Sequence, residues 1–143
     1  MEQLKTTRFG DIDIDENRLI TFPSGLPGFP EQKRFVLMEH NPGSPFMWLQ
    51  SADTPNLAFV VMDPFLIQSG YLEDLPPRDR ESALGKTDPP PLVLTIVNIP
   101  HGAPREMTVN LLGPLVIDTE AKTGKQVILA GSGYHTRHPV IPE

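Results

Sequence analysis

The amino-acid sequence predicts an all-β protein, built as a small antiparallel β-barrel or sandwich of about eight or nine short strands with one short helix. Three observations predict this fold class. Apolar residues occur in many short runs, several of them rich in β-branched side chains. The 17 prolines and 11 glycines are spread between these runs, where they mark turns and leave little room for long helices. The 143 residues have the length of one ordinary domain, so we expect residues 1–143 to form a single domain.

The first strands are expected near the N-terminus. Between Thr6 and Ile14, isoleucine alternates with aspartate, which is the period-two pattern of a half-buried strand with an exposed acidic face. A turn at 15–17 leads to a returning strand from Arg18 to Phe22. Prolines and glycines are dense from residue 23 to 30 and predict an ordered loop, which Leu26 and Phe29 are expected to hold against the core.

A central hairpin is predicted from Phe46 to Phe65, after a strand from Phe35 to Glu39. Its two apolar runs are separated by a polar segment that contains aspartate, proline and asparagine. The only tryptophan, Trp48, lies in the first run, and the second run at 57–62 is nearly continuous, which implies burial on both faces. We therefore expect Trp48 to be largely buried in the core.

One short helix is predicted after the central hairpin. Pro76 and Pro77 suit its first turn, because proline lacks an N–H group and its φ is already helical. Ala83 and Leu84 end the helical run, and Gly85 suits the position just past a helix end.

Four more strands are predicted in the C-terminal part of the chain. The run LVLTIVNI at 92–99 is the clearest strand, because it is rich in β-branched residues and a proline closes it. Apolar runs at 107–112, 115–117 and 126–129 predict the other three, with a turn at 122–125. The stretch after about residue 131 is expected to be a poorly tied tail.

Residue types that support catalysis or metal binding do not occur in the required patterns. The chain has no cysteine, and none of its serines lies in a Gly-x-Ser-x-Gly elbow. His135 and His138 are three positions apart, but the segment around them is not helical, so the spacing does not place them on one face. We expect no enzymatic activity, no metal and no cofactor. Without a signal peptide core or a run of roughly 20 apolar residues, a cytoplasmic protein is expected.

Negative charge is concentrated in the first half of the chain. Residues 1–75 hold 11 acids and 5 bases, whereas residues 76–143 hold 7 of each. This disfavours nucleic acid and anionic membranes as ligands and favours a basic protein partner. The acids expected to be exposed at this contact are Asp13, Asp15, Glu73 and Asp74. A cation site on the alternating aspartates of the first strand is geometrically possible, but a solvated acidic face is favoured, because the pattern of a calcium loop is absent.

An apolar tripeptide, Phe65, Leu66 and Ile67, follows the central hairpin. It stands after a proline and beside the stretch from Tyr71 to Asp74, which is acidic. An exposed interaction patch and ordinary core packing are almost equally favoured for these side chains. The tripeptide and Tyr71 therefore join the four acids as candidate protein-binding residues.

Six segments occur in an order and register that resembles the FliW family of flagellar assembly factors. They are TRFG at 7–10, LITFPSGLPGF at 19–29, RFVLMEH at 34–40, FMWLQSADTPNLAFVVMDPF at 46–65, NLLGPLVID at 110–118 and GKQVIL at 124–129. The resemblance covers nearly the whole chain, apart from 76–91 and the segment after 131.

The resemblance implies a cytoplasmic bacterial protein with a small β-barrel-like fold and no enzyme activity. Members of the family bind the translational repressor CsrA and prevent it from silencing flagellin mRNA, and flagellin captures them in turn. The acidic half agrees with this, because an RNA-binding repressor carries a basic surface. We expect a monomer that binds neither nucleic acid nor membrane directly. The alternative is a small-ligand or carbohydrate-binding β domain, with a weak enzymatic activity that uses Asp11, Asp13 or Asp63.

Overall fold

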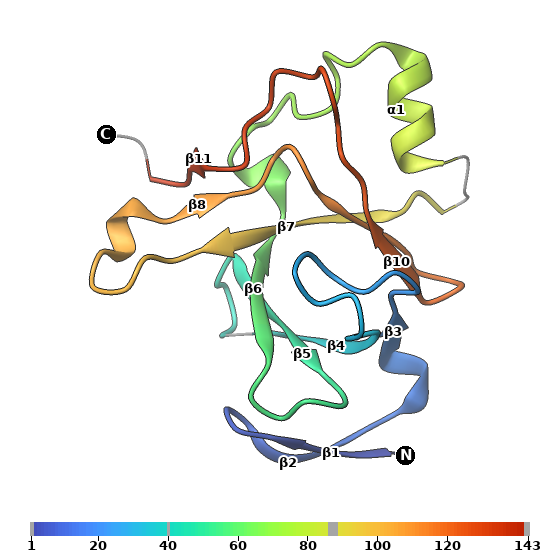
Figure 1. The fold of residues 1–143 in the computed structure, drawn as a ribbon, viewed down its shortest axis with the longest axis vertical. Helices are drawn as coiled ribbons and strands as arrows, with labels where there is room; N and C mark the ends of the chain where they lie inside the picture. The colour runs from blue at the N-terminus through green and yellow to red at the C-terminus, as the bar shows by residue number, and fades with distance from the viewer. Residues whose placement is uncertain (1, 40, 86–88, 142–143) are drawn as a thin grey trace.

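Seven strands form a closed barrel in the computed structural model, which describes residues 2–39, 41–85 and 89–141 (Figure 1). The strands are β3 (Leu19–Thr21), β4 (Arg34–Glu39), β5 (Phe46–Ser51), β6 (Ala58–Met62), β7 (Leu92–Asn98), β9 (Leu115–Asp118) and β10 (Thr123–Gln126). Their order is β7-β6-β5-β4-β3-β10-β9, and β9 closes the barrel by pairing with β7. All these pairs are antiparallel except β3 with β10, which is parallel. The prediction of a small antiparallel β fold with one short helix is confirmed.

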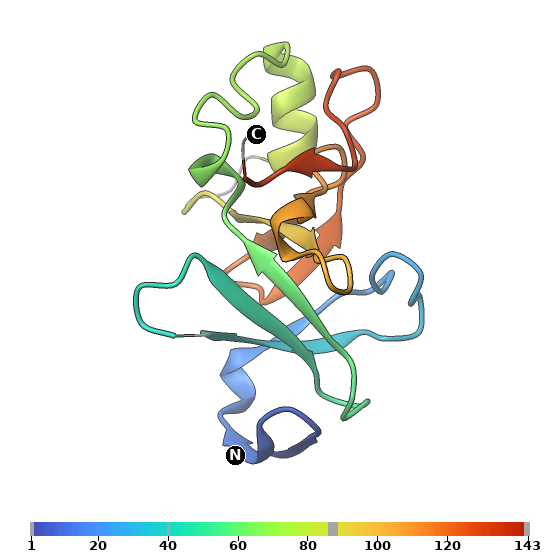
Figure 2. The same cartoon turned by 90° about the vertical axis from the view of Figure 1, so that its left-hand side faces the viewer.

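The remaining elements lie outside the barrel, toward the two ends of the molecule. At one end, β1 (Glu2–Thr6) and β2 (Gly10–Ile14) form a two-stranded sheet, and a 3-10 helix, η1 (Glu16–Arg18), links it to the barrel. At the other end lies the helix α1 (Pro77–Leu84) (Figure 2). The short strands β8 (Thr108–Val109) and β11 (His138–Pro139) extend the sheet from β7, and two further 3-10 helices are η2 (Pro64–Leu66) and η3 (Pro104–Glu106).

The apolar side chains form three clusters that follow this arrangement. The barrel interior is filled by Ile20, Phe22, Leu26, Phe35, Leu49, Val61, Leu94, Leu115 and Ile117. A second cluster lies under α1 and the loop before it, where Tyr71, Leu72 and Ala83 meet the outer side of the barrel. The third is small, and it joins Leu4 and Ile14 of the β1–β2 sheet to Val36 of β4.

The N-terminal pairing differs from the predicted one. The stretch from Thr6 to Ile14 is not one strand, because the chain turns between β1 and β2 and the two strands pair with each other. Gly10 has a φ of 71°, which glycine adopts without strain, and the Thr6 hydroxyl donates to the Gly10 carbonyl at 2.7 Å. The segment expected to return along this strand becomes β3, which instead pairs with β4 and β10.

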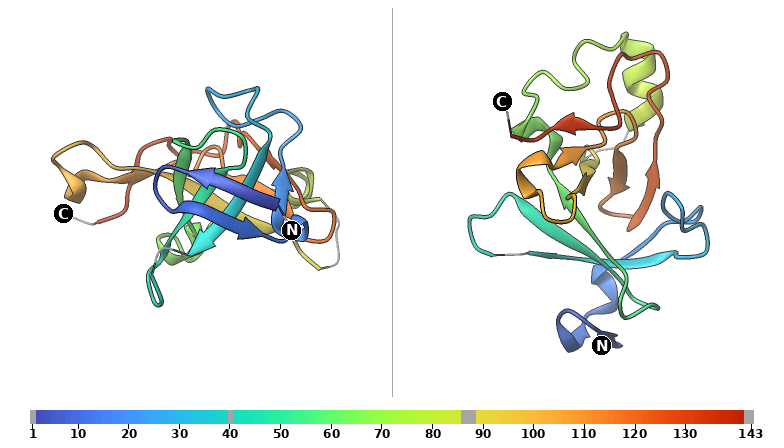
Figure 3. Two further views of the ribbon diagram at one scale, coloured as in Figure 1. Left: turned by 90° about the horizontal axis from the view of Figure 1, so that it is seen from below. Right: turned by 60° about the vertical axis from the view of Figure 1, so that its left-hand side comes forward.

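Trp48 is not a core residue, contrary to the prediction. It is half-buried on the outer face of β5, while its neighbour Leu49 points into the barrel and is fully buried. The ring of Phe9 stands edge-on to the indole at a centroid distance of 6.1 Å, and the guanidinium carbon of Arg8 lies 4.0 Å from the indole centroid. Seen from below, the β1–β2 sheet crosses the barrel strands on this side (Figure 3).

The predicted helix and most of the later strands are confirmed, with shifted limits. The helix α1 begins at Pro77, and Gly85 follows it with a φ of 74°. The predicted strand at 107–112 is shortened to β8, and the last barrel strand is β10 at 123–126 rather than 126–129. The turn expected at 122–125 lies earlier, and it ends at Lys122, which has a φ of 58°.

The prediction of a poorly tied C-terminal tail is wrong for residues 131–141, while residues 142–143 lie outside the described part of the chain. Strand β11 pairs with β8, and the carbonyl of His135 accepts the N–H groups of Leu111 and Leu112 at 3.1 and 3.3 Å. The N–H of Val140 donates to the Met107 carbonyl at 3.2 Å. These bonds satisfy backbone groups that β8 would otherwise leave unpaired.

Candidate protein-binding surface

An exposed apolar knob is formed by Phe65 and Leu66, which were two of the predicted patch residues. Asp63 begins this turn, and its carboxylate accepts the N–H of Phe65 at 2.8 Å, while Pro64 occupies the first helical position. The side chain of Leu66 is 65% exposed and that of Phe65 is 40% exposed. Ile67 is half-buried against the cluster below α1, so the exposed patch has two residues rather than three.

Tyr71 supports this knob from inside. The prediction that Tyr71 is a residue of the binding surface is wrong, because its side chain is not exposed. Its side chain is fully buried, its hydroxyl donates to the carbonyl of Leu111 at 2.5 Å, and its ring lies 5.7 Å from that of Phe65. Burial raises the pKa of Tyr71 above its ordinary value, because the phenolate would lose its hydration. The role of Tyr71 is therefore to position the loop that carries Phe65 and Leu66.

Tyr134, from the supposed tail, holds the same loop, and sequence reasoning missed it. Its hydroxyl donates to the carboxylate of Asp74 at 2.5 Å and accepts the N–H of Leu72 at 2.8 Å. Leu72 is buried and has a φ of 73°, a conformation that costs about 1 kcal/mol or more for a residue with a Cβ atom. The hydrogen bond to Tyr134 helps to keep Leu72 in this conformation. The signal in the sequence was a single aromatic residue among the glycines and polar residues at 131–138.

A cavity of about 270 Å³ opens beside Leu66. Its walls include Phe46 and Met47 of β5, both half-buried, which continue the apolar surface inward from the knob. Glu39 and Asp63 stand at this cavity, and the described lining residues include no basic side chain. The surface can therefore take an apolar side chain of a partner and favours a positive charge next to it.

The four predicted acids do not form one surface. Asp13 and Asp15 belong to the end of the molecule with the β1–β2 sheet, where Asp15 accepts the N–H of Asn17 at 2.9 Å. Glu73 and Asp74 lie in the loop between η2 and α1, at the opposite end (Figures 1 and 2). All four side chains are exposed, as expected, and Asp74 has a structural task because it accepts the bond from Tyr134.

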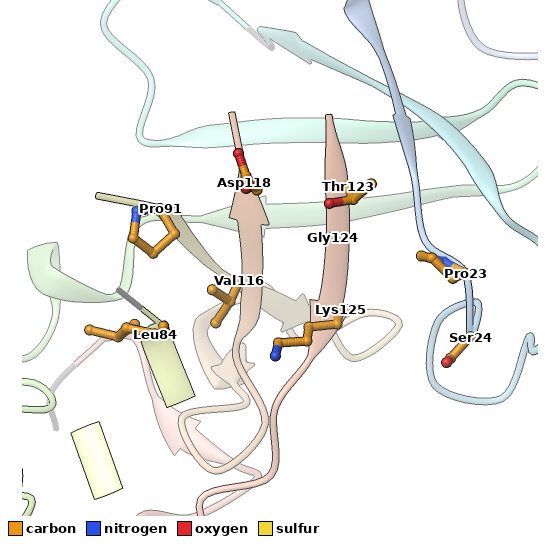
Figure 4. Close-up of a pocket in the computed structure, with 10 residues that line it drawn as sticks. Pro23, Ser24, Leu84, Pro91, Val116, Asp118, Thr123, Gly124 and Lys125 are labelled. Carbon is orange, nitrogen blue, oxygen red and sulfur yellow. The ribbon is translucent and has the colours of Figure 1, made fainter. Parts of the chain in front are cut away.

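A larger cavity of about 410 Å³ lies on the outer face of β9 and β10 and is the place to look for a small ligand (Figure 4). Val116 and Leu84 give it an apolar wall, and Asp118 and Lys125 are its charged groups. The alternative hypothesis invoked Asp11, Asp13 or Asp63, and none of these lines the cavity. In the described part of the chain, no group of three histidine or carboxylate side chains is arranged to hold a metal ion.

The fold defines a small closed β-barrel protein, and its surface around Leu66 exposes two apolar side chains beside a cavity with two carboxylates. The family model described as FliW protein matches residues 3–140, and the chain belongs to the FliW family of flagellar assembly factors. Among the described residues, no helix is long and apolar enough to cross a membrane.

Individual relatives agree with this assignment over nearly the full length. The flagellar assembly factor FliW of Moorella thermoacetica is 40% identical over 141 residues, which are 99% of this chain and 89% of the relative. That of Geobacter sulfurreducens is 42% identical over 138 residues, or 96% and 86% of the two chains. A crystal structure of the flagellar assembly factor FliW superimposes with a TM-score of 0.83 at 35% identity and covers 99% of this chain and 98% of that chain.

Proposed function

We propose that this flagellar assembly factor binds the translational repressor CsrA, relieves the repression of flagellin mRNA, and is itself captured by flagellin. It acts in the cytoplasm, as a monomer, by binding rather than by catalysis, and it contacts neither RNA nor membrane directly. Membership of the family supports the flagellar part of this proposal. The observation that carries the binding part is the knob of Phe65 and Leu66 beside a cavity with two carboxylates.

Flagellin is the partner assigned to the knob. A leucine that is 65% exposed on a turn braced from below is suited to enter the apolar face of an amphipathic helix, and a basic residue of that helix would meet Glu39 or Asp63. The repressor is assigned to the exposed acids, either Glu73 and Asp74 or, at the opposite end of the molecule, Asp13 and Asp15. The two partners compete for this protein, either because their sites overlap or because the sites are coupled, and such coupling acts equally in both directions.

A competition experiment with Leu66→Asp tests this assignment. Flagellin is titrated into a preformed complex of the protein with fluorescently labelled CsrA, and release is followed by anisotropy. We expect the wild-type protein to release CsrA, and the variant to need at least about tenfold more flagellin, because a desolvated carboxylate opposes the apolar contact.

The matched control is Ile99→Asp, which places the same charge on another exposed apolar residue, 45% exposed, at the end of β7. This control should behave like the wild type. Release from Leu66→Asp at the wild-type flagellin concentration, with the fold intact by circular dichroism, would remove the knob from the flagellin site.

A further inference from the structure

The barrel closes at a short seam between β3 and β10. Only one residue of β3 faces a residue of β10, Thr21 opposite Thr123, whereas β4 and β5 have five such facing pairs. In a parallel ladder the next donor to β10 would be the N–H of the residue two positions after Thr21. That residue is Pro23, which has no N–H, so the pairing stops and β10 is left with an unpaired edge.

The backbone groups on this edge belong to Gln126 and Ile128. Val127 and Leu129 turn their N–H groups the other way, toward the carbonyls of Pro114 and Leu112 at 2.9 and 2.8 Å. Alternate residues of an extended chain direct their N–H and C=O groups to opposite sides, so those of Gln126 and Ile128 face away from β9. No other described residue supplies a hydrogen-bond partner for these four groups.

Space lies beside the start of this edge. The cavity of about 410 Å³ extends over the outer face of β9 and β10, from Leu84 and Pro91 at one end to Pro23 and Ser24 at the other, where it passes the edge of β10 (Figure 4). A strand added to a sheet lies about 4.8 Å from its neighbour, with its side chains alternating between the two faces. The cavity therefore offers room for side chains of an added segment on the outer face of β10.

The side chains of β10 set the chemistry of such a segment. Lys125 lines the cavity and makes no ion pair with another described residue, whereas the other charged group there, Asp118, already accepts the N–H groups of Glu120 and Ala121. On the opposite face, Ile128 is 59% exposed. The outer face therefore favours an acidic side chain, and the other face favours an apolar one.

We propose that the edge of β10 from Gly124 to Ile128 binds a short extended segment of a partner protein in which acidic and apolar side chains alternate. The segment adds a strand to the barrel at the seam, its backbone bonds to Gln126 and Ile128, and its carboxylate pairs with Lys125. This site shares no residue with the knob of Phe65 and Leu66, so the proposal stands or falls independently of the flagellin assignment.

An exposed edge with a lysine and a nearby proline is also what a protein uses to avoid pairing with other chains. A peptide titration followed by nuclear magnetic resonance distinguishes a docking edge from a protected one. The probe is a short capped peptide of alternating valine and glutamate, added to the 15N-labelled full chain. We expect shift changes centred on the amides of Gln126 and Ile128, and slower exchange of both amide hydrogens.

Two altered peptides test the chemistry. Methylation of alternate backbone nitrogens should abolish binding, because it removes the donors of one edge. Replacing glutamate by lysine should weaken binding about tenfold, and the variant Lys125→Glu should reverse this preference. No shift of the Gln126 and Ile128 amides at about 1 mM peptide, or equal binding of the methylated peptide, overturns the proposal.

The protein backbone is tested by Ile128→Pro, which removes an N–H for which no other described residue supplies a hydrogen-bond partner. The matched variant Ile128→Ala keeps that N–H and shortens the side chain. Proline should weaken peptide binding more than alanine does. If alanine weakens binding as much as proline does, the side chain rather than the backbone edge binds the peptide, and strand addition is excluded. If the proline variant does not fold, the methylated peptide alone decides between these outcomes.

Discussion

Tyr71 and Tyr134, the only tyrosines of the chain, couple the C-terminal segment to the loop that carries Leu66. Their ring centroids lie 4.8 Å apart, the hydroxyl of Tyr134 donates to Asp74 in the loop, and the hydroxyl of Tyr71 donates to the carbonyl of Leu111 between β8 and β9. Burial is the main cause that raises the pKa of both phenols, and for Tyr134 the bond to Asp74 adds to it. The knob is thus supported by a brace of two tyrosines, of which Tyr71 is fully buried and Tyr134 is half-buried.

This brace predicts a shift in the ionisation of tyrosine. In the folded protein, tyrosinate absorbance at ~295 nm should appear only above the ordinary pKa of about 10. The folded phenols keep their protons to a higher pH than the unfolded ones, so their contribution to the free energy of unfolding is constant below about pH 10 and falls as the pH rises further. Urea unfolding at several pH values measures this fall. Complete titration of both phenols near pH 10 in the native protein would contradict the brace.

Glycine at position 124 is what allows β10 to approach β3. A Cβ atom there would lie 2.4 Å from the Cε2 atom of Phe22, whose side chain is fully buried in the barrel. The backbone at Gly124 does not have a positive φ, so the requirement is one of space. The pairing of β10 with β3 therefore depends on the close approach of the Gly124 backbone to the ring of Phe22.

We therefore expect Gly124→Ala to lower the free energy of unfolding by about 1 to 3 kcal/mol, the usual cost of overpacking a core. The control is Gly70→Ala, where the nearest atom to the added Cβ is the Glu73 carboxylate at 4.0 Å, and the change should stay within about 0.5 kcal/mol. Chemical denaturation of both variants makes the comparison. Equal stabilities would mean that the ring of Phe22 moves away easily.

Charge is divided unevenly over the whole molecule. The five bases of the first half of the chain all lie within residues 1–34. Between Arg34 and Arg78 there is no lysine or arginine, and this stretch holds five acids. Arg34 itself pairs with Glu2 and Asp53 at 3.3 and 2.6 Å. Along the sequence, the acids of the β1–β2 end are therefore interspersed with bases, whereas the acids from Glu39 to Asp74 are followed by bases only at Arg78 and Arg80 of α1.

This division predicts which end steers the basic repressor. Glu73→Lys should slow the association of CsrA about tenfold, and Asp13→Lys should slow it less, although both reversals change the net charge from −6 to −4, two units each. Stopped-flow rates should fall as salt rises above about 0.15 M, where the Debye length is near 8 Å, with little change in dissociation. Equal slowing by both variants would show that only the total charge matters.

Local sequence was sufficient for the elements whose signal is local. Strand β7 has a continuous β-branched run, the hairpin of β5 and β6 has a polar turn between apolar runs, and α1 has prolines at its start and Gly85 at its end. The exposure of Phe65 and Leu66, at 40% and 65%, agrees with the patch alternative. Their part in binding, like that of the four acids, stays a prediction.

The fold class and most of the strands could be predicted from the sequence, because periodicity and turn chemistry act over a few residues, and the resemblance of six segments indicated the family. Tertiary structure alone decided which face of a strand is inside, so Trp48 lies on the outer face of the barrel and Tyr71 lies in the core. It also decided the pairing of β3 with β10, about a hundred residues apart in sequence, and the anchoring of Tyr134. An alternating pattern indicates that the two faces of a strand differ, but it does not indicate which segments pack on each face. Those segments come from distant parts of the chain.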